Sequence, residues 1–172
     1  NDGLGGGVTI NNGTLNAKAS VESLGYGAVT LAGGTLAFSD AGTVANAITV
    51  SADATISNST NVTLNKVISG TGALTKLGTG VLTLSGNNAD YSGNIALNEG
   101  VIIAAHNNAL GNTTGSTTVA SGTTLRVGNG LTLAENLTIS GVGINSAYGA
   151  LKINEGTGSA TVTGDITLAA DS

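Results

Sequence analysis

A short alternating strand, a polar turn and a second short strand recur along this chain, and this repetition constrains its fold more than any other feature. Val8 and Ile10 share one face of the first strand while Thr9 takes the other, which is the period of a β-strand. The first three copies begin about 20 residues apart. The clearest copies lie at residues 8–15, 29–38, 48–56, 95–103 and 117–127.

The residue composition argues against helix and disorder. Hydrophobic residues make up 40% of the 172 residues, enough for a core, and only 9% are charged, whereas disordered chains carry more charge. Helical i, i+3, i+4 spacing is missing, and each of the 28 glycines would cost a helix about 1 kcal/mol. Proline, which interrupts hydrogen-bond ladders, is absent. The chain is therefore predicted to be all-β.

Two all-β architectures fit the turns between these strands. The turn sequences NNG, AGG and NEG could close hairpins in a meander or sandwich, because Gly and Asn tolerate positive φ. A self-similar period with small side chains favours instead a right-handed parallel β-helix (a β-solenoid) with about 20 residues per coil. Val8, Val29 and Ile48 would then form one inward column. A second inward column would contain Leu15, Leu36 and Ile56.

Single coils of this kind are not expected to fold alone. Ordering about 20 residues costs roughly 1–2 kcal/mol each, whereas four or five buried aliphatic side chains return roughly 1.5–3 kcal/mol apiece. Neighbouring coils must supply the remaining stabilisation, so residues 1–172 are predicted to form one solenoid segment of about eight or nine coils. The polar, strand-poor residues 106–116 are predicted to be a loop that leaves the coil.

Several residue types are missing or scarce. Without cysteine, disulfides, thiolate catalysis and Cys-ligated metals are excluded. A net charge of −5 with five Lys and Arg argues against nucleic acid, which is bound by basic surfaces. Because Met is absent, the chain is predicted to be a processed or excised piece. No apolar run approaches the roughly 18 residues of a membrane helix, so this segment is not expected to insert into a membrane.

Residues 68–102 contain the most specific pattern of the chain, in which glycine and leucine alternate around Lys76 before a Tyr91 corner. This segment resembles the autotransporter-associated β-strand repeat, whose pattern runs roughly G-x-G-x-L-x-K-x-G-x-G-x-L-x-L-x-G, then N-x-Y-x-G and a closing strand. Ala89 and Asp90 make the corner slightly longer than in the tightest version. The matching positions are Gly70, Gly72, Leu74, Lys76, Gly78, Gly80, Leu82, Leu84, Gly86, Asn87 or Asn88, Tyr91, Gly93, Gly100 and Val101.

The resemblance implies a passenger region of an autotransporter. Such passengers are right-handed parallel β-helices that are secreted or displayed beyond the outer membrane of Gram-negative bacteria. In that family the repeat is linked to secretion and folding of the passenger and not to a reaction. The resemblance therefore implies an extracellular or cell-surface location for this chain.

Side chains suited to catalysis are few. His106 is the only histidine, so neither a catalytic triad nor a His-rich metal site can be built from it. The carboxylates are interpreted as solvated charges, although stacked coils could bring two of them within the roughly 5–9.5 Å that glycoside hydrolysis needs. These carboxylates include Asp40, Asp53, Asp90, Glu99, Glu135, Glu155 and Asp165.

A polysaccharide-cleaving β-helix would also need basic residues and aromatic platforms. Arg126 and Lys152 are interpreted as isolated. The Gly-rich pieces match neither the P-loop nor the dinucleotide-binding pattern, and DGLGGGVTI lacks the Asp of the calcium-binding nonapeptide, so these glycines are interpreted as corners. The aromatic residues are Tyr26, Phe38, Tyr91 and Tyr148.

Two surface patterns have ordinary explanations. Threonine is expected on exposed strands because of its β-propensity, and its spacing is predicted to be too irregular for a long matched array like that of ice-binding solenoids. These threonines include Thr9, Thr30, Thr49, Thr63 and Thr138. Glycosylation sequons are interpreted as Asn turns that meet Thr-rich strands. They begin at Asn12, Asn58, Asn61, Asn112 and Asn136.

No catalytic, cofactor-binding or metal-binding residue is predicted. The leading hypothesis is a non-catalytic structural and adhesive segment: a stiff spacer that contacts cell surfaces or glycans through a lateral face. One alternative is a filament subunit, because an uncapped solenoid exposes unpaired strand edges at both ends and could self-associate there. A lesser alternative is a polysaccharide-acting β-helix enzyme.

Overall fold

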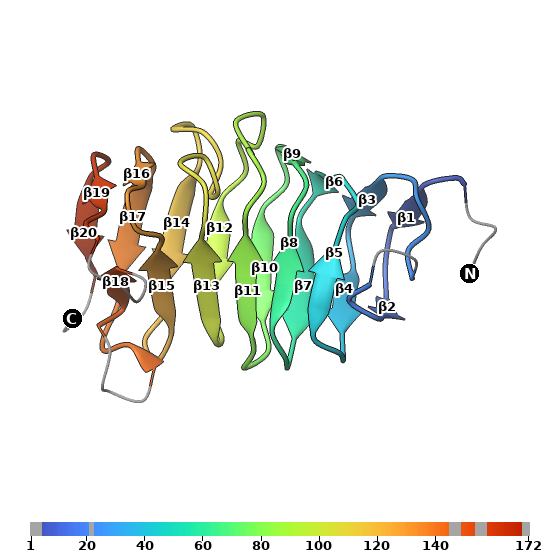
Figure 1. The fold of residues 1–172 in the computed structure, drawn as a ribbon, viewed down its shortest axis with the longest axis horizontal. Coiled ribbons are helices and arrows are strands. Elements are labelled where there is room, and N and C mark those ends of the chain that lie inside the picture. Colours follow the sequence, from blue (N-terminus) through green and yellow to red (C-terminus); the bar gives the residue numbers. More distant parts are fainter. Residues whose placement is uncertain (1–4, 21–22, 145–148, 154–157, 170–172) are drawn as a thin grey trace.

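The computed structural model describes residues 5–20, 23–144, 149–153 and 158–169 of the chain. These residues form a parallel β-solenoid, in which successive coils are stacked along one axis (Figure 1). Every strand pair in this part of the chain is parallel. The predicted all-β solenoid is confirmed, and the hairpin architecture is excluded.

The strands form four sheets along the rod. The four-stranded sheet contains β1 (Val8–Ile10), β3 (Val29–Ala32), β6 (Ile48–Ala52) and β9 (Ile68–Gly70). The eight-stranded sheet contains β2 (Thr14–Ala17), β4 (Thr35–Phe38), β7 (Ala54–Asn58), β10 (Leu74–Leu77), β12 (Ile95–Leu97), β14 (Ser116–Val119), β17 (Asn136–Ile139) and β20 (Ile166–Leu168). The six-stranded sheet contains β5 (Gly42–Val44), β8 (Val62–Leu64), β11 (Val81–Leu84), β13 (Val101–Ala104), β15 (Thr124–Val127) and β18 (Leu151–Ile153). The two-stranded sheet contains β16 (Thr132–Leu133) and β19 (Thr161–Val162).

The core consists of inward columns of aliphatic side chains. Val8, Val29 and Ile48 are Cα partners on neighbouring strands, as predicted, and the column continues to Ile68. The second predicted column is also confirmed, and it runs the whole length of the eight-stranded sheet. Its members are Leu15, Leu36, Ile56, Lys76, Leu97, Val119, Ile139 and Leu168.

The number of complete coils is smaller than predicted. The eight-stranded sheet has eight strands, but the six-stranded sheet continues only six of these coils in the described residues. About six turns are therefore complete, rather than eight or nine. In the described residues, the six-stranded sheet has no strand after β2 and none after β20.

The Gly and Asn turns are corners between sheets. Gly13, Gly34 and Gly100 end the NNG, AGG and NEG turns and have positive φ values of 75°, 70° and 73°. An added Cβ at Gly34 would lie 2.7 Å from the backbone oxygen of Gly13 in the preceding coil. Glycine is therefore required at this corner both by the backbone conformation and by the close approach of the neighbouring coil.

The outward threonines contradict the prediction of irregular spacing. Differences in coil length are absorbed at the corners, so the strands keep their register and seven of eight positions in one outward column of the eight-stranded sheet are threonine. This column contains Thr14, Thr35, Thr55, Thr75, Ala96, Thr118, Thr138 and Thr167. Thr9, Thr30 and Thr49 align separately on the four-stranded sheet, and Thr63 lies on the six-stranded sheet.

Residues 106–116 have no strand before β14, as predicted for a loop, but they do not leave the coil. Leu110 is buried in the core, and the backbone nitrogen of Asn112 donates to the backbone oxygen of Tyr91 in the coil below. After β9 the four-stranded sheet ends, and this segment takes its place over residues 87–92. The prediction of an excursion was therefore wrong.

Candidate functional site: the buried polar cluster of the repeat

Three long polar side chains of the 68–102 segment lie inside the core. Lys76, Asn88 and Tyr91 are each about 1% exposed. They are called the repeat cluster below. Because burial of a polar group is costly unless it is hydrogen-bonded, their partners explain how the core tolerates them.

Lys76 occupies a position in the long inward column, between Ile56 and Leu97. Its Nζ donates to the backbone oxygens of Leu77 (2.9 Å), Gly78 (2.6 Å) and Glu99 (3.2 Å). The three protons of the ammonium group therefore each have an acceptor. The first two acceptors are the last residue of β10 and the first residue after it, and the third lies at the corner of the next coil, so Lys76 links two coils through the core.

Glu99 supports the same corner from outside. Its Oε2 accepts a hydrogen bond from the backbone nitrogen of Gly78 (2.7 Å), although the residue itself is exposed. Burial lowers the pKa of Lys76 to about 8, while the negative charge of Glu99 opposes this shift. The pKa of Lys76 therefore lies close to neutral pH, where the side chain changes between its charged and neutral forms.

Of the two asparagines that could fill the asparagine position of the repeat pattern, Asn88 is the one that is buried. Its Oδ1 accepts from the backbone nitrogen of Ile68 (2.7 Å), and its Nδ2 donates to the backbone oxygen of Ala109 (2.6 Å). One side chain therefore joins the coil below to the coil above. Asn87 is exposed and its Oδ1 accepts from Nδ2 of Asn108, so it does not have this role.

Tyr91 fixes the following corner. Its hydroxyl lies 2.9 Å from the backbone oxygen of Gly72 and 3.1 Å from that of Asn94, and it can donate to either. Burial, and secondly the negative charge of Glu135, raise the pKa of Tyr91 well above its usual range, so the hydroxyl keeps its proton. Gly93 packs against it: an added Cβ would lie 2.7 Å from the tyrosine oxygen and 2.0 Å from the backbone oxygen of Gly72.

Glu135 contradicts the interpretation of the carboxylates as solvated charges. It is 3% exposed, and its Oε1 accepts a hydrogen bond from Oγ1 of Thr117 (3.1 Å), whereas Oε2 has no hydrogen-bond partner in the described residues. Burial raises the pKa of Glu135 to about 8, and the hydrogen bond from Thr117 opposes this shift. This burial could not be predicted from the sequence, because Glu135 precedes its strand like any polar turn residue.

The other described carboxylates are exposed. Asp53 and Glu99 act as acceptors at corners, since Oδ1 of Asp53 accepts from the backbone nitrogen of Ala73 (2.9 Å). In the part of the chain that the structure describes, no group of three or more His, Cys, Asp or Glu side chains could hold a metal ion. Glu155 and Tyr148 lie outside the described residues. The exposed described carboxylates are Asp40, Asp53, Asp90, Glu99 and Asp165.

The remaining candidate residues have mostly structural positions. Nδ1 of His106 accepts from the backbone nitrogen of Asn108 (3.1 Å) in a turn. Phe38 is buried, whereas Tyr26 is 72% exposed. Arg126 and Lys152 are Cα partners on β15 and β18, so the interpretation of them as isolated was wrong.

Within the described ranges, no helix is long and apolar enough to cross a membrane.

The sequons differ in accessibility. Asn58 is 1% exposed, and its Nδ2 donates to the backbone oxygens of Thr60 (2.6 Å) and Val81 (3.0 Å), so it is closed to modification in the folded state. Asn112 and Asn136 each accept a backbone hydrogen bond through Oδ1. Asn12 and Asn61 are exposed.

A parallel β-solenoid is the fold that the motif predicted, whereas the burial of its polar side chains was not predicted. Residues 74–104 match the family described as the passenger-associated-transport-repeat. Over 99% of its length, the chain is similar to the adhesin BmaC autotransporter of Brucella suis biovar 1 (strain 1330), with 34% identity over 176 aligned residues. The chain covers 5% of that relative. No solved structure is significantly similar to the chain. Residues 74–104 thus carry the passenger-associated repeat, and the predicted resemblance to an autotransporter passenger is confirmed.

We expect the Lys76→Met substitution to destabilise the fold by about 1–3 kcal/mol, because the carbonyls of Leu77, Gly78 and Glu99 lose their shared donor. Lys66→Met is the matched control, since Lys66 is exposed, and its change should stay within about 0.5 kcal/mol. Denaturant unfolding measures both. Equal midpoints for the two variants would contradict the role of Lys76.

The free energy of unfolding should depend on the protonation of Glu135. Its pKa rises from 4.5 to about 8 on folding, so the folded state holds the extra proton and the stabilisation is complete only below about pH 4.5. As the pH rises from there to about 8, stability should fall by up to about 1.4 kcal/mol per pH unit. Urea unfolding across this range should show the fall in the native chain relative to Glu135→Gln, which cannot ionise. If the free energy of unfolding depends on pH in the same way in both proteins, the prediction is wrong.

Proposed function

We propose that this chain is a non-catalytic structural and adhesive segment of an autotransporter-type protein that is secreted or displayed at the bacterial cell surface. It serves as a stiff stalk, and its repeat promotes folding and secretion of the passenger. The passenger repeat and the similarity to an autotransporter adhesin support this location. The observation that carries the stalk role is the unbroken register of the eight-stranded sheet.

A continuous register supports stiffness for a physical reason. Each interior coil is hydrogen-bonded to both neighbours, and the inward columns bury side chains such as Leu36, Ile56 and Leu97 completely. Bending the rod would stretch backbone ladders on one side and open the packed core, and packed cores are not continuously deformable. Local side-chain links such as Asn88 add to this resistance.

The repeat cluster supports a role in folding. Its hydrogen bonds join residues about 20 positions apart, which are neighbours in consecutive coils. Because no coil is expected to be stable alone, the first pair of coils is the costly step, after which further coils add to an existing edge. A cluster that fixes the register of consecutive coils would lower the cost of that step.

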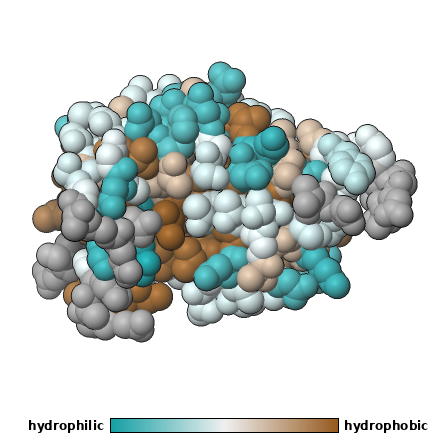
Figure 2. Space-filling view, in the orientation of Figure 1, coloured by the Kyte–Doolittle hydropathy of each residue, from teal (hydrophilic) through white to brown (hydrophobic). Residues whose placement is uncertain are grey.

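An adhesive role would use a lateral face of the rod. Figure 2 shows one long face, on which an apolar area lies between hydrophilic residues at the upper and lower edges. The six-stranded sheet places the partly exposed side chains of Val81 and Ile103 outward. Mixed surfaces of this kind suit contacts with a cell surface or with glycans.

We expect the rod to keep one fixed distance between its first coil and the turn after β14 in solution. Because the native chain lacks cysteine, spin labels can be attached after Asn12→Cys and Ser121→Cys at two exposed turns, and pulsed electron resonance then reports their distance distribution. A single narrow distribution is expected. A distribution as broad as that of the denatured chain would contradict the stalk role.

The folding role predicts slower refolding in Asn88→Ala. This substitution leaves the backbone nitrogen of Ile68 and the backbone oxygen of Ala109 without their partners, which costs about 1–3 kcal/mol for each buried group. Stopped-flow refolding should slow markedly, while Asn87→Ala, the neighbouring exposed asparagine, should refold at nearly the native rate. If Asn88→Ala accelerates only unfolding, the cluster forms late and the folding role is wrong.

A further inference from the structure

A hollow of about 470 Å³ lies at the corner between the eight-stranded and six-stranded sheets. It is called the corner hollow below. Its lining comes from the corners of four consecutive coils, so the hollow runs along the side of the rod. It is lined by Thr79, by residues 98–100 and 121–123, and by Ile144.

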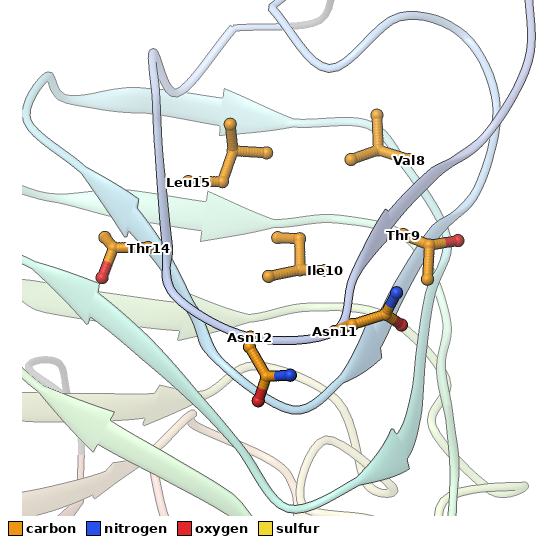
Figure 3. Close-up of a pocket in the computed structure, with 7 residues that line it drawn as sticks. All are labelled: Val8, Thr9, Ile10, Asn11, Asn12, Thr14 and Leu15. Atoms are coloured by element: carbon orange, nitrogen blue, oxygen red, sulfur yellow. The ribbon is translucent and has the colours of Figure 1, made fainter.

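The hollow at the first coil has a different character. Val8, Ile10 and Leu15 point into its volume of about 410 Å³, while Thr9 and Thr14 point away from it (Figure 3). The three aliphatic side chains belong to inward columns of the rod. That hollow therefore continues the core, whereas the corner hollow lies outside the core and is lined mainly by exposed turn residues.

The corner hollow arises from unequal corner lengths. Three residues separate β10 from β11 (78–80) and β12 from β13 (98–100), and four separate β14 from β15 (120–123). Eleven residues separate β17 from β18 (140–150). Tight turns therefore form the floor, and Ile144 of the long corner forms one wall.

This wall is bonded to the corner below it. The backbone nitrogen of Gly122 donates to the backbone oxygen of Val142 (2.8 Å), and the backbone nitrogen of Ile144 donates to Oγ1 of Thr124 (3.0 Å). Oγ1 of Thr124 in turn donates to the backbone oxygen of Gly149 (3.3 Å). These bonds hold the wall in place without a ligand, and a preformed site avoids part of the entropic cost of binding.

The lining offers both hydrogen-bond donors and acceptors. Oε2 of Glu99 accepts from the backbone nitrogen of Gly78 (2.7 Å), which fixes the carboxylate, and a carboxylate has further acceptor positions. Asn98 supplies an amide that donates and accepts, and Ser121 supplies a hydroxyl that does the same. All three lining side chains are on exposed residues.

Apolar surface lies beside these polar groups. Gly122 has a φ of 80°, and an added Cβ there would meet nothing within 4 Å, so the space next to its backbone is open. A ligand can therefore approach the backbone closely at this turn. Ile144 adds a half-buried aliphatic side chain. The combination suits a ring that has an apolar face and a polar rim.

The charge of the lining narrows the ligand class. Among the described residues that line the corner hollow, Glu99 alone is charged. It would repel an anionic ligand, and the whole chain carries a net charge of −5. A cationic ligand would compete with Lys76, whose Nζ donates to the backbone oxygen of Glu99 (3.2 Å) from inside the core and partly offsets its charge. Uncharged hydroxyl groups are therefore the matching partners.

We propose that the corner hollow binds an uncharged oligosaccharide. Its hydroxyl groups bond to Glu99, Asn98 and Ser121, and the C–H face of one sugar ring lies against Ile144 beside Gly122. Four corners span three coil spacings, about 14 Å, so more than one sugar unit fits along the rod. The proposal rests on the adhesive part of the proposed function and gives it a site and a ligand class.

Trisaccharides of different charge test the ligand class. Maltotriose and triacetylchitotriose are uncharged, chitotriose is cationic and trigalacturonate is anionic. In NMR titrations of the native chain, an uncharged trisaccharide should shift the amide signals of residues 98–100 and 121–123 with a Kd of about 1 mM, and the charged ones should bind about tenfold more weakly. No response to either uncharged trisaccharide, shifts only elsewhere on the rod, or equal or tighter binding of a charged one would overturn the proposal.

Substitutions test the site. Glu99→Gln should weaken binding of the uncharged trisaccharide about tenfold, because hydrogen bonds to charged groups are stronger, while Gln keeps an acceptor for the backbone nitrogen of Gly78. Asn98→Ala should weaken it about threefold to tenfold. Asp53→Asn is the matched control, since exposed Asp53 also accepts a backbone hydrogen bond from the next coil (Ala73, 2.9 Å) but lies at another corner. Unchanged binding in both hollow variants would contradict the site.

Cell attachment separates this proposal from the adhesive function on which it rests. Beads coated with the native chain should attach to cultured cells, and beads coated with Glu99→Gln should attach several-fold less. Equal attachment of both would overturn the saccharide site and leave the adhesive function. Native-chain beads that attach no better than uncoated beads would contradict the adhesive function itself, and the trisaccharide titration then decides the site alone.

Discussion

The in-register stacking of one coil on the next is the interaction on which the rest of this structure depends. A coil has no interior of its own, because its inward side chains are covered only when equivalent side chains lie above and below them. The parallel ladders set the spacing at which this happens, and the alternation of side chains decides which residues face inward. A slip of one residue would turn Leu36 and Ile56 outward and expose the whole column, so the apolar pattern and the ladder fix the same register.

Buried polar groups are tolerated where the ladders end. At a corner the backbone turns away from its neighbours, and its carbonyls need partners that a strand would have provided. Lys76 meets this need at the corner after β10, and the one hydroxyl proton of Tyr91 does so for Gly72 or Asn94. Apolar replacements would fill the space but leave these oxygens unpaired. Glu135 is different, since one of its oxygens has no hydrogen-bond partner in the described residues, and burial raises its pKa to about 8.

Most of the fold could be predicted from the sequence, because the strand alternation and the 20-residue period are local patterns. The columns through Val8 and Leu15 followed directly from them. The buried state of Lys76 was not predicted, although its place in the alternation, two residues after Leu74, indicates an inward side chain. Glu135 could not have been found in this way, because it lies outside a strand and its burial depends on the neighbouring coil.

The threonine column shows why register cannot be read from spacing alone. The step between Cα partners is 20 or 21 residues from Leu15 to Leu97, but it reaches 29 residues between Ile139 and Leu168. These unequal steps made the threonines look irregular in the sequence. Corners can absorb extra residues at little cost, since loop-closure entropy grows slowly with length, whereas a shift within a strand would disrupt every buried contact. The buried core residues set the register of the strands, and the outward side chains are aligned as a consequence. The arrangement of the outward face therefore depends on residues that lie inside the rod.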